Sequence, residues 1–229
     1  MAGDADELAV WAGFPVATGS RPLVVVEGYV RVGPSGFGSG EAKLAFLDGA
    51  IDSAVELPGG VDALFAPAHD PARRTARRLS ITAITRIEAD FETDRGPQAL
   101  PAYALDTDGT AEPVIVLDPA TPVWWPERPT PEWTAGGTAT IDADGLTLHV
   151  LARGGALTEF LSCRLTETDS AVLAEPITRE RDAGGRAVHA IGVMRRVSGR
   201  LASTLGDRVL INAAGQPIVV RDVDPEKWA

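Results

Sequence analysis

Residues 79–91 read LSITAITRIEADF, and apolar and polar side chains alternate along almost the whole stretch. Alternation with a period of two is typical of a β-strand that buries one face and exposes the other. The exposed face ends in three acidic residues, Glu88, Asp90 and Glu92. The apolar face is expected to form part of a core through Leu79, Ile81, Ala83, Thr85, Ile87, Ala89 and Phe91.

Shorter segments of the same kind follow on both sides of this stretch. Residues 142–145 read DADG, and the Asp144-Gly145 pair tolerates the backbone of a tight turn, so a β-hairpin is expected between 138–141 and 146–151. Glycine, proline and aspartate separate the other apolar segments. Further strands are expected at 23–32, 100–105, 114–117, 160–165, 171–177, 187–201, 208–212 and 218–220.

One segment has helical rather than strand spacing. Within residues 39–55, Leu44, Leu47, Ile51 and Val55 fall on one stripe of a helix. Ser39 suits the N-terminal cap of this helix. A single α-helix near residues 39–55 is therefore expected.

Prolines and tryptophans crowd residues 122–137, which makes regular structure there improbable. This segment is interpreted as a junction between an N-terminal half, residues 1–121, and a C-terminal half, residues 138–229. Trp124, Trp125 and Trp133 lie in the junction. They either attach it to the core or form an aromatic surface for sugars, peptides or cations.

The two halves share a weak repeat. Residues 79–91 align with 187–199, and the later segments PVIVLD at 113–118 and PIVVRD at 217–222 also correspond. The expected fold is therefore mainly β. It is either a β-sandwich or two linked β-sheet halves, which a duplication would explain.

The alignment pairs residues of opposite charge. Glu88 aligns with Arg196, and Glu92 aligns with Arg200. Opposite charges on neighbouring strands attract, so the hypothesis is that these side chains meet within one sheet or across a two-fold axis in a homodimer. Together with the three tryptophans and Asp90, they are the candidate surface for a ligand or partner.

Composition limits the classes of function. The net charge of −11 disfavours nucleic acid as a partner. No apolar stretch is long enough for a membrane span, and the acidic N-terminus lacks a secretion signal, so a cytoplasmic protein is expected. A secreted form whose signal had been removed would give the same sequence.

Motifs that would bring a cofactor or metal are incomplete. Residues 33–40, GPSGFGSG, lack the lysine of a phosphate-binding loop, and the acidic turns at 106–109 and 142–145 lack a full set of calcium ligands. Cys163, His149 and His189 are interpreted as structural. No catalytic residue, cofactor or metal ligand is therefore assigned.

These observations favour a non-catalytic binding or scaffolding protein whose ligand is a protein, a peptide or a small molecule. Two alternatives stay open. One is an enzyme of unrecognised type with a site in a cleft between the halves. The other is a homo-oligomeric structural protein that associates through a strand face or edge.

Overall fold

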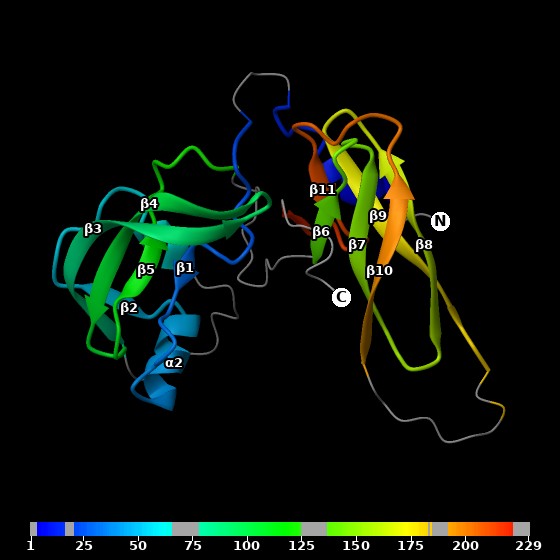
Figure 1. Cartoon of the computed structure of the whole chain (residues 1–229). Coiled ribbons are helices and arrows are strands. Elements are labelled where there is room, and N and C mark those ends of the chain that lie inside the picture. Colours follow the sequence, from blue (N-terminus) through cyan, green and yellow to red (C-terminus); the bar gives the residue numbers. More distant parts are fainter. Residues whose placement is uncertain are drawn as a thin grey trace. The chain divides into compact units, whose positions relative to one another are not determined.

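The computed structural model shows a mainly β protein (Figure 1). The chain divides into two compact units, called unit 1 and unit 2 here. Unit 1 contains residues 1–26, 93–96 and 134–229, and unit 2 contains residues 27–92 and 97–133. The structure describes residues 4–16, 21–65, 78–124, 137–182, 184 and 192–221.

Unit 2 is built on a five-stranded sheet in the order β1-β5-β4-β3-β2. The alternating stretch at 79–91 forms most of β3, and its two ends are buried through Leu79, Ile81 and Phe91. The middle of the strand is less covered than the alternation predicts, since Thr85 on the apolar face is exposed. The strands are β1 (Val30–Arg31), β2 (Ile51–Ser53), β3 (Leu79–Thr93), β4 (Gly96–Thr107) and β5 (Val114–Leu117).

The expected helix is shorter than predicted. Helix α2 spans Gly40–Leu47, and Ser39 caps it as expected by accepting a hydrogen bond from the backbone N–H of Ala42 at 3.1 Å. Gly49, with φ +62°, turns the chain out of the helix, so the following residues form β2 instead.

The predicted leucine stripe of this helix is also wrong. Leu44 and Leu47 are exposed, and the helix buries Ala42 and Ala45 against Leu79. Small side chains let the helix approach the sheet closely. Helix α2 appears beside the sheet of unit 2 in Figure 1, and a short 3₁₀ turn, η1 (Asp62–Phe65), follows it in the chain.

Unit 1 contains a β-sandwich. One sheet has the order β10-β7-β6-β12 and the other has the order β11-β9-β8. Their inner faces share one core that includes Leu148, Val150, Val172, Val197 and Leu210. The strands are β6 (Thr138–Ile141), β7 (Thr147–Gly154), β8 (Thr158–Glu167), β9 (Ala171–Glu180), β10 (Val193–Arg200), β11 (Val209–Ile211) and β12 (Val219–Val220).

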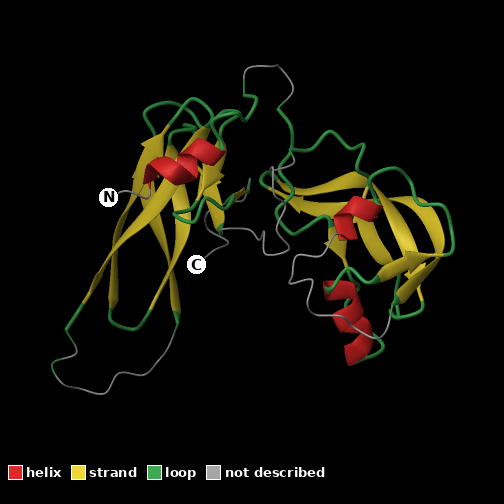
Figure 2. Ribbon diagram, turned by 180° about the vertical axis from the view of Figure 1, so that it is seen from behind, coloured by secondary structure: helices red, strands yellow, loops and turns green. Residues whose placement is uncertain are grey.

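The N-terminal residues belong to unit 1. Helix α1 (Asp4–Val10) lies over its strands in Figure 2, and Trp11 directly after the helix is 0% exposed. The Trp11 indole N–H donates to the carbonyl of Gly215 at 3.0 Å. Among the described residues, no helix has the length and apolar character needed to cross a membrane.

The two aligned strands occupy different positions in their sheets. β3 lies between β4 and β2, whereas β10 is the edge strand next to β7. The later strands differ as well, because β5 is antiparallel to both neighbours and β12 is parallel to β6. These topologies weigh against a common origin for the two halves.

Candidate functional site

The outward side of β7 and β10 is mainly polar near the hairpin turn, and Leu151, opposite Arg196, is an apolar residue on the same side. Successive side chains of a strand point to opposite faces. Leu148, Val150 and Val197 therefore lie in the core, and the residues that alternate with them lie on the other face. The strand register places Ser198 opposite His149. We call this surface the polar face; it consists of Asp142, Asp144, Thr147, His149, Arg196, Ser198 and Arg200.

His149 lies at the centre of the polar face. Its Nδ1 is 2.8 Å from the Ser198 hydroxyl oxygen, and its Nε2 is 2.9 Å from an Asp142 carboxylate oxygen. An ionised carboxylate can only accept a hydrogen bond, so Nε2 carries the proton and Nδ1 of the neutral ring accepts from the Ser198 hydroxyl. The three side chains form a directed hydrogen-bond chain from Ser198 through His149 to Asp142.

The hairpin turn next to this chain is also ordered. Gly145, with φ +68°, closes the predicted DADG turn, and one Asp144 carboxylate oxygen accepts from the backbone N–H groups of Leu146 at 2.8 Å and Thr147 at 3.0 Å. These two bonds, with a further bond from Arg200 at 3.0 Å, lower the pKa of Asp144 to about 2. The turn therefore holds a carboxylate that stays ionised and fixes the Arg200 guanidinium.

Two residues of the polar face, Arg196 and Arg200, were candidates from the sequence. His149 was interpreted as structural, and Ser198 and Asp142 were not candidates. The pattern that could have pointed to them is the DADG hairpin, whose register brings Asp142 near His149 on the neighbouring strand. The contact with Ser198 comes from pairing between β7 and β10, which are far apart in sequence.

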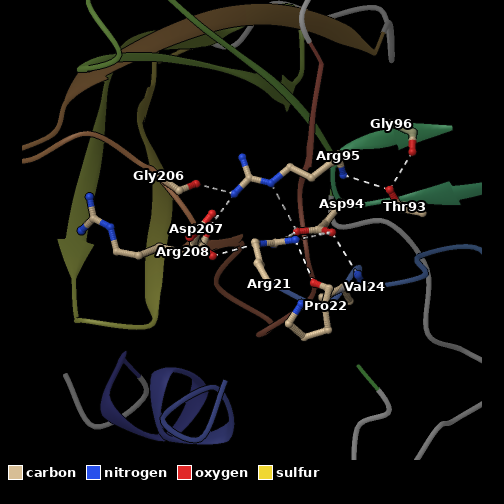
Figure 3. Close-up of polar contacts among 10 residues, drawn as sticks. All are labelled: Arg21, Pro22, Val24, Thr93, Asp94, Arg95, Gly96, Gly206, Asp207 and Arg208. Atoms are coloured by element: carbon tan, nitrogen blue, oxygen red, sulfur yellow. Dashed lines mark hydrogen bonds and ion pairs between the residues drawn. The ribbon is translucent and has the colours of Figure 1, made fainter. Parts of the chain in front are cut away.

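A second polar cluster in unit 1 is buried and surrounds Asp94, in the turn between β3 and β4. The Asp94 side chain is 2% exposed, forms an ion pair with Arg21 and accepts a hydrogen bond from the Val24 backbone N–H at 3.0 Å. Figure 3 shows the side chains of Arg21 and Arg95 near that of Asp94. Burial, followed by the charge of Arg21, lowers the pKa of Arg95.

Backbone carbonyl oxygens accept further hydrogen bonds from the two arginines of this cluster. Arg95 donates to the carbonyl oxygens of Gly206 at 2.8 Å and Arg208 at 2.9 Å, and Arg21 donates to that of Asp207 at 2.7 Å (Figure 3). Each guanidinium has several acceptors of the protein itself. The cluster therefore attaches the 93–96 turn to the 206–208 loop and is structural.

Unit 2 has a smaller counterpart around Asp118, which follows β5. The Asp118 side chain accepts from the Ala120 backbone N–H at 2.9 Å and from Arg86 at 3.2 Å. Arg86 itself is largely exposed. Asp118 therefore orders the turn after β5 and has a partner that water can reach.

The acidic candidates lie on β3. Glu88 and Asp90 are exposed, whereas Glu92 is half-buried and its backbone N–H donates to Glu27 at 2.7 Å. β3 and β10 belong to different sheets, so the expected pairing of their charges within one sheet is not formed. Pairing across a two-fold axis stays a prediction.

The tryptophan candidates are only partly covered by the structure. Trp124 is half-buried in unit 2, and Trp125 and Trp133 lie outside the described residues. A pocket of about 420 Å³ occurs elsewhere, in unit 1, between the α1 region and the loop that joins β8 to β9. It is lined by Leu8, Ala9, Ala12, Thr168, Asp169 and Ser170.

Of the other residues weighed for chemistry, His189 lies outside the described residues. Cys163 is buried in the sandwich core, and burial raises the pKa of its thiol to about 11, which keeps it a poor nucleophile. In the part of the chain that the structure describes, no three His, Cys, Asp or Glu side chains gather as metal ligands would. In the 33–40 loop, Phe37 packs on Phe46 of α2 with ring centroids 5.2 Å apart.

Comparison with models of protein families, with curated proteins and with solved structures finds no match for this chain.

Proposed function

We propose that this chain is a ligand-binding β-protein and that the polar face of unit 1 is the surface that holds its ligand. The observation that supports this most is the set of direct hydrogen bonds that join His149 to Ser198 and Asp142, and Arg200 to Asp144. Side chains that are held in place before binding lose less conformational freedom when a ligand arrives.

The charges of the face favour a small polar molecule or a peptide over a polyanion. Two carboxylates, Asp142 and Asp144, and two guanidinium groups, Arg196 and Arg200, belong to this face, so it carries both signs; Arg200 pairs with Asp144. A ligand that offers both a negative group and hydrogen-bond donors would match it. The net charge of −11 also opposes long-range attraction of nucleic acid.

A thermal-shift screen of the full chain against small peptides, sugars and nucleotides tests this proposal, because a ligand of the folded state raises Tm. The matched variants are Arg196→Ala on the polar face and Glu88→Ala on the exposed face of β3. A ligand of the polar face should stabilise the wild-type chain and Glu88→Ala but lose its effect on Arg196→Ala. Ligands whose Tm shift is unchanged by Arg196→Ala and by Ser198→Ala would contradict the assignment of the face.

A further inference from the structure

The arrangement around Ser198 goes beyond what binding requires. Ser198 is exposed on β10, its hydroxyl oxygen is 2.8 Å from His149 Nδ1, and the opposite nitrogen of that ring is 2.9 Å from Asp142. A nucleophile within hydrogen-bond distance of a base, with a third group that orients the base, is the arrangement that activates serine hydroxyls. We infer that Ser198 accepts acyl groups from small activated esters, with His149 as its base and Asp142 as a positioning residue.

The direction of the hydrogen bonds supports this role for His149. Asp142 accepts from Nε2–H, which leaves the lone pair of Nδ1 directed at the Ser198 hydroxyl. The ring can therefore take the proton from Ser198 without changing its orientation. The resulting imidazolium would be stabilised by the carboxylate of Asp142, as in other chains of serine, histidine and aspartate.

The neighbours of Ser198 on β10 suit the charge that the reaction develops. Arg196 and Arg200 are two residues away on either side, so they share the face of Ser198 at a spacing of roughly 7 Å. Positive groups near the attacked carbonyl favour the oxygen that becomes negative in the transition state. They also favour esters that carry a carboxylate or phosphate group.

The reaction has two balanced steps. In the first, Ser198 Oγ forms a bond to the carbonyl carbon and its proton moves to His149. The bond from that carbon to the leaving oxygen breaks, and His149 passes the proton to that oxygen, so an alcohol or phenol is released and His149 is neutral again. In the second, water attacks the acyl-serine, its proton passes through His149, and the carboxylic acid and the Ser198 hydroxyl are released. No oxidant, reductant or other co-reactant is needed.

The test uses the full chain and 4-nitrophenyl acetate, with the acetylated residue located by mass spectrometry of peptides. The expected product is acetyl-Ser198. Because a general base contributes typically a hundredfold or more, His149→Asn should slow acetylation by about a hundredfold. Ser198→Ala should abolish labelling of that peptide, and Ser162→Ala, which removes another exposed strand serine of unit 1, should leave the rate unchanged.

Asp142→Asn tests the positioning role separately. It should slow acetylation of Ser198 while the far-UV circular dichroism spectrum and Tm stay close to those of the wild-type chain. Acetyl groups found on lysine or the N-terminus but not on Ser198 would overturn the inference, and so would an equal rate at Ser198 in folded His149→Asn. If a ligand raises the Tm of Ser198→Ala but not that of Arg196→Ala, the proposed binding function holds whatever the result of acetylation, so the two proposals can fail separately.

Discussion

β3 of unit 2 and β10 of unit 1 both present charged side chains away from their cores, and the two faces differ in which of these side chains their neighbours hold. On β3, Arg86 pairs with Asp118. Among the described residues, the side chains of Glu88 and Asp90 on β3 have no hydrogen-bond or ion-pair partner. On β10, Ser198 meets His149 and Arg200 meets Asp144. The difference arises from the strand next to β10. β7 places His149 beside Ser198, and the 142–145 turn before β7 places Asp144 beside Arg200.

The units also differ in how they hold a buried carboxylate. Asp94 in unit 1 is paired with Arg21, which is itself buried, whereas Asp118 in unit 2 is paired with Arg86, which is largely exposed. A guanidinium that water cannot reach depends on its partner much more than one that water can solvate. Unit 1 should therefore be the more sensitive of the two to loss of its buried carboxylate.

The largest expected effect follows from this contrast. Asp94→Ala leaves the buried charge of Arg21 without its partner and should lower the free energy of unfolding by about 3 to 5 kcal/mol. Asp118→Ala should cost about 1 to 3 kcal/mol, as for the loss of an acceptor of buried hydrogen bonds. Urea unfolding followed by circular dichroism measures both, and equal losses would show that the two clusters do not differ as described.

Tryptophan truncation compares the cores of the two units. Trp11→Ala removes a side chain that is 0% exposed and should destabilise the chain by about 3 to 5 kcal/mol. Trp124 is only half-buried, so Trp124→Ala should have a clearly smaller effect on the same urea transition. The reverse order would mean that Trp11 does not hold the N-terminal segment on unit 1.

The Asp144 turn predicts a pH dependence. Its pKa is lowered to about 2 in the folded chain, so its stabilising effect is fully present above its ordinary pKa near 3.8 and is lost as the pH falls towards 2. Asp144→Asn should therefore have a lower Tm than the wild-type chain at pH 7, and the gap should narrow between pH 4 and pH 2. A gap that stays constant over this range would show that the charge of Asp144 does not stabilise the turn.

The smallest effect concerns the charges of β3 and β10. These strands belong to different sheets and Arg200 already has Asp144 as a partner, so Glu92→Arg and Arg200→Glu should change stability independently. Their effects in the double variant should add within about 0.5 kcal/mol. Rescue by the second substitution, at protein concentrations where light scattering detects dimers, would instead support the pairing across a two-fold axis.

The sequence predicts the individual strands of this fold better than it predicts which strands and helices lie next to each other. Alternation identifies β3, and DADG identifies the hairpin of β6 and β7, because both signals are local. The end of α2 was misplaced because Leu44, Leu47 and Ile51 keep helical spacing across Gly49, whose positive φ ends the helix. The leucine stripe also pointed to the wrong face of the helix, because α2 contacts Leu79 through Ala42 and Ala45.

The candidate site was only partly predictable for the same reason. Arg196 and Arg200 stand out as charges on a strand face, but a lone histidine in a strand gives no signal of its own. The role of His149 becomes visible only in the register of β7 with β10, which places Ser198 beside it. Residues 1–26 belong to unit 1 and make contacts with it such as that of Trp11 with Gly215. These contacts join residues far apart in the sequence, so no local sequence pattern predicts them.

His149 is held between Ser198 and Asp142, and ¹⁵N NMR of the histidine side chains can detect this arrangement in solution. The chain has three histidines, and the signal of His149 is assigned by its absence in His149→Asn. We expect neutral His149 to exist as the Nε2–H tautomer and Asp142→Asn to remove this preference. A mixture of tautomers in the wild-type chain, unchanged by Asp142→Asn, would contradict it.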